Sequence, residues 1–163
     1  MTTDRVLYLI RHADALDRAG WTQPDRIRPL SERGAAQAQL IADRLAPRPI
    51  VRLLSSPYAR CVATLEPLAG RLGLALEEAD YLAEGHGISR VTSRLLEDAL
   101  SCGPDTELAA CSHGDIVPFV IAQLAAAAKL ELPERSSPKA VVYTVRLEDD
   151  AVVEIQRTAP PRP

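Results

Sequence analysis

A continuous apolar run near the N-terminus constrains the fold more than any other feature of this sequence. Residues 6–10 read VLYLI, five residues rich in strand formers. Such a run is typical of a strand that is buried on both faces, as in a parallel sheet covered by helices. Arg11 and His12 follow it directly. Polar side chains at the end of a buried strand either lie at a solvated edge or form a site at the carboxyl end of the sheet, where open α/β folds bind ligands.

The rest of the chain alternates short strand-forming runs with longer helical patterns. Further strands are expected at 51–55, 74–79 and 107–112, with a C-terminal hairpin over 140–156. Helices are expected at 32–46, 56–73, 88–100 and 115–128. This alternation predicts an α/β fold, with one three-layer domain whose mostly parallel central sheet is flanked by helices. The domain is expected to span residues 1–158, and residues 159–163 are expected to be a disordered tail.

Local signals predict where two of the helices begin and where one is interrupted. Ser31 and Ser56 are expected as N-caps, and Pro57 is expected at the first position of the helix that follows Ser56. Pro67 lies inside the same helical pattern. Because proline lacks the N–H that an interior helical position donates, a kink or break is expected near Glu66.

Composition excludes several broad classes of function. The content of 47% hydrophobic and 25% charged residues is that of an ordinary globular protein, and a net charge of −3 gives no support for nucleic-acid binding. Three cysteines without a CxxC spacing fit a reducing compartment and argue against a zinc site. The apolar stretch 116–132 is interrupted by polar residues, and the N-terminus lacks a signal-peptide pattern. We therefore expect a cytoplasmic protein with no membrane and no nucleic-acid partner.

Polar residues follow three of the expected strands. Arg11 and His12 follow the first, Arg60 lies near the start of the helix after the second, and His113 stands at the entry of the helix after 107–112. The carboxyl ends of parallel strands lie on one edge of the sheet, so these side chains can converge there. Two helix N-termini add free N–H groups at the same edge. The combination suits a phosphoryl group, although each residue taken alone is also explained as a surface or helix-entry residue.

The motifs also resemble, in the same order, those of the histidine phosphatase superfamily, which is named for its RHG motif and includes the phosphoglycerate mutase-like enzymes. The resemblance covers roughly residues 5–125 and is carried by Arg11-His12, LSERG at 30–34, SPYAR ending in Arg60 with Thr64 a turn later, and SHG around His113. It looks closest to the small branch typified by bacterial phosphohistidine phosphatases. The segments 26–39 and 63–69 are also similar to the phosphatase-like C-terminal half of some two-domain Nudix hydrolases.

The resemblance implies a mechanism that needs no metal and no other cofactor. His12 would be the nucleophile that accepts the phosphoryl group, and an unperturbed imidazole is largely neutral at cytoplasmic pH, as attack requires. Arg11, Arg60 and His113 would hold the non-bridging oxygens and stabilise the charge of the transition state. Water would then hydrolyse the phosphohistidine.

Five further residues receive expectations from the same resemblance or from their local context. Glu84 lies where the mutase-like branch carries its acid, so it is expected to act as general acid and then base, the alternative being a solvated loop glutamate. The loop around His86 favours no defined role for it. Arg28 would contact the phosphate or the substrate's body, or lie on the surface. Gly34 would allow a close backbone approach. Ala13 replaces the glycine of RHG, a substitution familiar in the small branch, and we do not read it as inactivation.

The function expected from these residues is a metal-independent phosphatase that hydrolyses a phosphomonoester or a protein phosphohistidine through a covalent phosphohistidine on His12. The chain has no large insertion that could form a lid, which favours an open site. Within this chemistry, the alternative substrate is a small phosphorylated metabolite or a nucleotide. A mutase is disfavoured, because it needs a closed site that excludes water. Outside this chemistry, the alternative is a non-catalytic phosphoryl-binding module, which has no need to keep His12.

Overall fold

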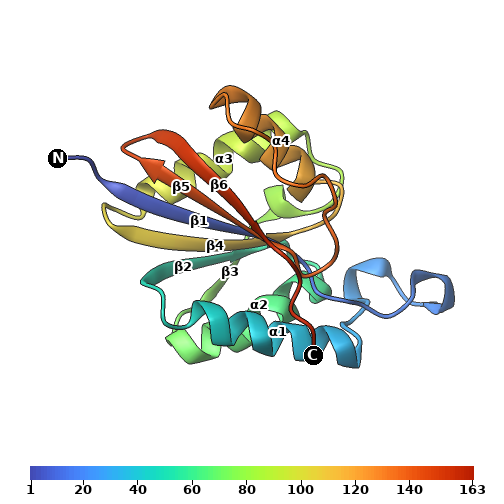
Figure 1. Cartoon of the computed structure of the whole chain (residues 1–163). Coiled ribbons are helices and arrows are strands. Elements are labelled where there is room, and N and C mark those ends of the chain that lie inside the picture. The colour runs from blue at the N-terminus through green and yellow to red at the C-terminus, as the bar shows by residue number, and fades with distance from the viewer.

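The computed structural model describes all 163 residues, and a six-stranded sheet lies between two pairs of helices (Figure 1). The strands are β1 (Asp4–Arg11), β2 (Ile50–Ser55), β3 (Leu76–Glu78), β4 (Thr106–Ser112), β5 (Val142–Glu148) and β6 (Ala151–Thr158). The α-helices are α1 (Glu32–Leu45), α2 (Ala59–Leu72), α3 (Ile88–Ser101) and α4 (Val117–Ala127). Short 3₁₀ turns are η1 (Arg18–Gly20), η2 (Asp25–Ile27) and η3 (Asp80–Leu82).

The strand order is β3-β2-β4-β1-β5-β6. Strands β3, β2, β4 and β1 run parallel, whereas the C-terminal hairpin of β5 and β6 pairs antiparallel with the β1 edge. The expected α/β fold with a mostly parallel central sheet is therefore confirmed, and so is the hairpin. Residues 159–163 have no regular secondary structure, but Pro161 among them is buried, so a disordered tail stays a prediction. No helix combines the length and the apolar character needed to cross a membrane.

The continuous apolar run of β1 follows from helices on both faces of the sheet. Leu7 and Leu9 pack into the core beneath α3 and α4, while Tyr8 and Ile10 pack into the core beneath α1 and α2. Figure 1 shows these two helix pairs on opposite sides of the strands. Alternate side chains of β1 thus enter two different apolar layers. A polar side chain in either layer would be buried without a partner, which costs free energy of folding.

The predicted N-cap of α1 is confirmed, and the predicted start of α2 is wrong by two to three residues. The Ser31 hydroxyl accepts a hydrogen bond from the Gly34 amide at 3.0 Å. The N-cap of α2 is Tyr58 rather than Ser56, and Pro57 precedes the helix. The hydroxyl of Ser56 lies 2.8 Å from a ring nitrogen of His113, so it belongs to the carboxyl edge of the sheet and not to the first turn of α2.

Of the predicted kink or break near Glu66, the break is wrong, because α2 continues through Pro67 to Leu72, while a kink stays a prediction. An interior proline costs a helix about 3 kcal/mol. Leu65 and Leu68 are fully buried on either side of Pro67, and their packing against the sheet holds the helix together. Tertiary packing therefore outweighs the local preference.

The sheet topology brings three strand ends together. Arg11 at the end of β1 is in register with Ser112 at the end of β4, and Ser55 at the end of β2 is in register with Cys111. Because β4 lies between β1 and β2, the residues that follow these strands meet at one edge. A long loop, residues 12–31, leaves β1 at this edge before α1 begins.

Candidate active site

The two histidines that the sequence placed after β1 and β4 lie side by side. The ring centroids of His12 and His113 are 5.5 Å apart in an edge-to-face arrangement, and the two residues are only 5% and 1% exposed. Arg60, in the first turn of α2, is completely buried beside them. A pocket of about 380 Å³ opens at this edge, and it is called the phosphoryl pocket below. Its lining includes Arg11, His12, Arg18, Arg28, Glu84 and Lys139.

Hydrogen bonds fix the orientation of the His12 ring. Its Nδ1 lies 2.8 Å from the carbonyl oxygen of Ala13. A carbonyl can only accept, so we assign the ring proton to Nδ1, which leaves a lone pair on Nε2. The main chain here is fastened on both sides, because His12 N–H donates to the carbonyl of Ser112 at 3.0 Å and Ala13 N–H donates to Thr64 Oγ1 at 2.9 Å. Ala13 is fully buried, so its methyl group is accommodated in place of the family's glycine.

Burial and positive neighbours keep both imidazoles neutral. Desolvation lowers the pKa of His12 to about 3, with further lowering by the charges of Arg60, Arg11 and Lys139. Desolvation likewise lowers the pKa of His113 to about 3, with contributions from His12 and Arg60. A neutral imidazole with a free Nε2 is the form that can act as a nucleophile.

These lowered pKa values predict that the fold loses stability in acid. Unfolded histidine titrates near pH 6.5, so between pH 6.5 and about 3 the unfolded chain binds protons that His12 and His113 exclude in the native state. The stabilisation is complete above pH 6.5 and is lost as the pH falls toward 3. From pH 7 to pH 5 each histidine contributes a loss of about 2 kcal/mol in the free energy of unfolding. Urea denaturation at both pH values should show a loss about 2 kcal/mol smaller in His12→Gln than in the unchanged protein, and equal losses would contradict the assignment.

Two carboxylates hold the buried arginines in place. Arg60 Nη2 donates to Asp25 Oδ2 at 3.1 Å and to Glu84 Oε1 at 2.7 Å. Arg28 Nε donates to Asp25 Oδ1 at 2.9 Å, and Arg28 is only 5% exposed. The alternative that Arg28 lies on the surface is therefore wrong. Although partial burial opposes it, hydrogen bonds from Arg28 and Arg60 lower the pKa of Asp25. The Nη2 atom of Arg18 lies 3.6 Å from both carboxylates.

Two buried donors at this edge have no partner in the protein, namely the Nε atoms of Arg11 and Arg60. Buried polar groups are usually paired, so the two unpaired donors are exceptional. Arg11 lines the phosphoryl pocket, whereas Arg60 is buried behind its lining. Sequence reasoning singled out both arginines. It missed Asp25, Arg18 and Lys139, which lie in loops without helical or strand periodicity and carried no signal that pointed to the site.

Glu84 lies where it can exchange a proton with a group in the pocket. Its Oε1 is 3.4 Å from His113 Nδ1, and its side chain is 32% exposed. The other ring nitrogen of His113 is 2.8 Å from the Ser56 hydroxyl. Glu84 also accepts a hydrogen bond from Arg60 Nη2. These contacts argue against the alternative in which Glu84 is a solvated loop residue.

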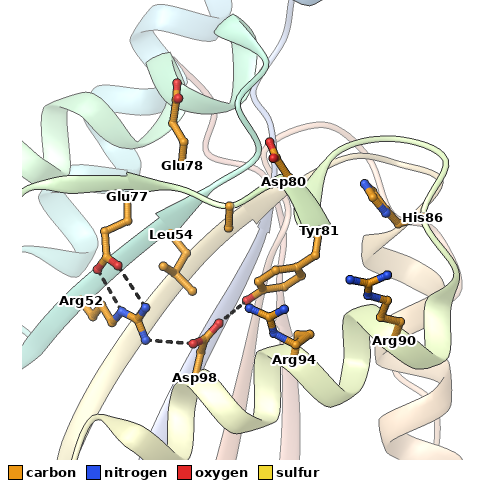
Figure 2. Close-up of a pocket in the computed structure, with 11 residues that line it drawn as sticks. Arg52, Leu54, Glu77, Glu78, Asp80, Tyr81, His86, Arg90, Arg94 and Asp98 are labelled. Carbon is orange, nitrogen blue, oxygen red and sulfur yellow. Dashed lines mark hydrogen bonds and ion pairs between the residues drawn. The ribbon is translucent and has the colours of Figure 1, made fainter.

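His86 lies elsewhere, in a separate pocket of about 350 Å³ between β2, η3 and α3 (Figure 2). There Arg52 donates hydrogen bonds to Glu77 and Asp98, and the hydroxyl of Tyr81 donates to Asp98 at 2.6 Å. These charged groups are largely paired with one another, and His86 does not line the phosphoryl pocket. No group of three or more His, Cys, Asp or Glu side chains is arranged to hold a metal ion anywhere in the chain.

The family model of the histidine phosphatase superfamily (branch 1) matches residues 7–89. The chain belongs to this superfamily. The matched segment contains His12, Arg60 and Glu84, while His113 lies beyond its end. The resemblance inferred from the sequence motifs is therefore confirmed.

Two relatives differ in length from the present chain. The 8-oxo-(d)GTP phosphatase of Mycolicibacterium smegmatis is 28% identical over 162 residues, which cover 96% of this chain and 49% of that protein. The chain thus spans about half the length of this relative. An uncharacterised protein of Mycobacterium tuberculosis is 47% identical over 55 residues, which cover 34% of this chain and 27% of that protein.

Solved structures of two phosphatases share the fold. The protein histidine phosphatase SixA complexed with tungstate has a TM-score of 0.75 at 24% identity, over 95% of this chain and 97% of that chain. A mycobacterial glucosyl-3-phosphoglycerate phosphatase has a TM-score of 0.68 at 19% identity, over 94% and 97%. At these identities the likeness establishes the α/β architecture of the superfamily.

Proposed function

We propose that this protein is a phosphatase that hydrolyses a phosphomonoester or a protein phosphohistidine through a covalent phosphohistidine on His12. One observation carries the proposal. A neutral imidazole with a free Nε2 lies in a pocket lined by four basic side chains, with the unpartnered Nε donors of Arg11 and Arg60 beside it.

In the first step His12 Nε2 attacks the phosphorus atom, the new N–P bond forms, and the bond from phosphorus to the leaving group breaks. Arg11, Arg60 and Arg28 hold the non-bridging oxygens, whose charge they stabilise in the transition state. His113 Nδ1–H donates a hydrogen bond to an oxygen of the phosphoryl group, which takes the place of the Glu84 carboxylate beside that nitrogen. In the second step water attacks the phosphorus atom, the N–P bond breaks, and phosphate leaves with His12 neutral again.

Glu84 is the group proposed to move the proton. In the first step its protonated carboxyl gives a proton to the leaving oxygen, and in the second its carboxylate takes one from the attacking water. The position beside His113 and at the solvent-exposed side of the pocket supports this role.

Glu84→Gln is expected to lower kcat on an alkyl phosphate by about 10²-fold, a typical contribution of general acid catalysis. The same change should cost less than about tenfold on a phosphohistidine substrate, because imidazole leaves more readily than an alkoxide. Steady-state kinetics on both substrates measures the difference. Equal losses of kcat on the two substrates would contradict the assignment of Glu84 as the group that transfers the proton.

Turnover of an aryl phosphate, with and without EDTA, tests the proposed function as a whole. We expect turnover that EDTA leaves unchanged. Activity that vanished with the chelator would contradict a mechanism without a metal. Tight phosphate binding with no turnover of aryl phosphate, alkyl phosphate or phosphohistidine would favour a non-catalytic binding module instead. The cytoplasmic location and the lack of a nucleic-acid partner stay predictions.

A further inference from the structure

An apolar pocket of about 380 Å³ adjoins the phosphoryl pocket. It lies between α4 and the segment 132–137, and its lining includes Gly114, Phe119, Leu132, Ser137 and Tyr143. The charged residues Glu134 and Arg135 also line it. Gly114 lines both pockets. The two pockets therefore share a boundary at the residue after His113.

The walls of this pocket expose apolar side chains to solvent. Phe119 is 57% exposed and Leu132 is 44% exposed. They line the pocket together with Pro118 and Pro133, whose rings are apolar. Exposed apolar surface that lines a hollow beside a polar site is typical of a ligand subsite. The exposed Phe119 ring offers a surface on which a planar ring can stack.

The same pocket contains two hydroxyl groups without partners. The Ser137 hydroxyl is buried and makes no hydrogen bond. Tyr143 is 2% exposed and lines the pocket, and no group of the protein hydrogen-bonds to its hydroxyl. An aliphatic ligand would offer neither hydroxyl a hydrogen-bond partner. A planar ring with nitrogen or oxygen atoms at its edge would stack on Phe119 and also satisfy the hydroxyls.

A contact joins Arg11, which lines the phosphoryl pocket, to Ser137, which lines the apolar pocket. The carbonyl oxygen of Ser137 accepts a hydrogen bond from Arg11 Nη1 at 2.6 Å. Gly114 packs so closely on the guanidinium that a Cβ atom there would lie 2.7 Å from Arg11 Cζ. The position of the apolar pocket is thus tied to a side chain that holds the phosphoryl group.

We propose that the apolar pocket binds a planar heteroaromatic ring carried by the substrate, so that the substrate class is a phosphoester with a nucleobase-type ring. This proposal rests on the proposed function for the chemistry at His12. The ring stacks on Phe119 and hydrogen-bonds to Ser137 and Tyr143, while the phosphoryl group lies against Arg11. Phe119 and Tyr143 are specificity-determining residues in this account.

A matched pair of substrates tests the proposal. Adenosine 5′-monophosphate and guanosine 5′-monophosphate carry a base, and ribose 5-phosphate carries the same 5′-phosphate without one. We expect kcat/KM at least about tenfold higher for one or both nucleotides, in the range that stacking of a base on an aromatic side chain supplies. Phe119→Ala should remove most of this preference, and Tyr143→Phe should reduce it. Neither should change kcat/KM for ribose 5-phosphate more than about twofold.

Val51→Ala is the control, because Val51 is 45% exposed on β2 and lines neither pocket. This variant should leave kcat/KM unchanged for both the nucleotides and ribose 5-phosphate. Equal kcat/KM for nucleotides and ribose 5-phosphate in the unchanged protein would overturn the proposal, as would a Phe119→Ala loss of the same size on both.

Equilibrium binding separates this proposal from the proposed function. Calorimetry with His12→Ala, which lacks the nucleophile, should show a nucleotide bound at least about tenfold more tightly than ribose 5-phosphate. If His12→Ala shows this binding preference but the unchanged protein shows no turnover, the ring subsite is supported and the phosphatase function is rejected. Turnover with no binding preference would retain the phosphatase and reject the subsite.

Discussion

Replacement of His12 by alanine is expected to lower kcat by about 10⁴-fold or more, since removal of a nucleophile leaves only the catalysis that binding and electrostatics supply. His12 is the residue whose Nε2 is free in the phosphoryl pocket, while its Nδ1 is bonded to the carbonyl of Ala13. Its neighbour His113 cannot replace it, because the two ring nitrogens of His113 already face Glu84 and Ser56.

This loss of kcat should arise in the chemical step and not from weaker binding of the phosphoryl group. The groups proposed to hold the anion, Arg11, Arg28 and Arg60, are anchored by contacts that do not involve the His12 side chain. Inorganic phosphate should therefore bind to His12→Ala within about tenfold of its affinity for the unchanged protein, as measured by calorimetry. Activity within tenfold of the unchanged protein would contradict the assignment of the nucleophile.

Gly34→Ala is expected to destabilise the fold by about 3 kcal/mol, near the upper end for overpacking in a tightly packed region. A Cβ atom at Gly34 would lie 1.8 Å from the carbonyl oxygen of Asp14. This neighbour is main chain and cannot rotate away. The same carbonyl accepts a hydrogen bond from the Ser31 amide at 3.0 Å, and the Ser31 hydroxyl donates to the Asp14 carboxylate at 2.6 Å.

Gly70→Ala is the matched control for Gly34→Ala. Gly70 also lies inside a helix, α2, but a Cβ atom there would meet nothing within 4 Å. Because alanine favours the helix, this change should stabilise the protein by about 0.5–1 kcal/mol. Thermal and urea unfolding of the two variants measures both effects. Similar effects at Gly34 and Gly70 would mean that α1 is not fastened to Asp14 as described.

The contact of Gly34 with Asp14 also reaches the active site. Asp14 lies two residues after His12, and its amide donates to Gln37 of α1 at 3.0 Å. The first turns of α1 therefore hold the segment that follows His12, the proposed nucleophile. A close backbone approach at Gly34 was expected from the sequence, and its partner, Asp14, becomes visible only in the structure.

Much of the fold was predictable because the sequence patterns are local. The apolar run of β1, the helical periodicities and the hairpin each follow from neighbouring residues in the chain. The start of α2 and its course through Pro67 were not predictable in this way. Both depend on distant groups, namely His113, which contacts Ser56, and the sheet against which α2 packs.

The residues of the candidate site that lie at or just after strand ends were predictable from the sequence. Arg11, His12, Arg60 and His113 each follow a parallel strand, and parallel strands end at one edge. The loop residues that complete the pocket, such as Asp25 and Lys139, reach it through turns whose path the sequence does not specify. Their contribution is electrostatic, because Lys139 lowers the pKa of His12 and Asp25 holds two arginines. 

Capture of the covalent intermediate tests the central claim most directly. The protein is mixed with an aryl phosphate, quenched rapidly in alkali during turnover to preserve acid-labile phosphohistidine, digested, and analysed by mass spectrometry. We predict one added phosphoryl group on the peptide that contains His12, and no such group in His12→Ala. Turnover with no phosphorylated peptide, or with the phosphoryl group on His113, would contradict the account.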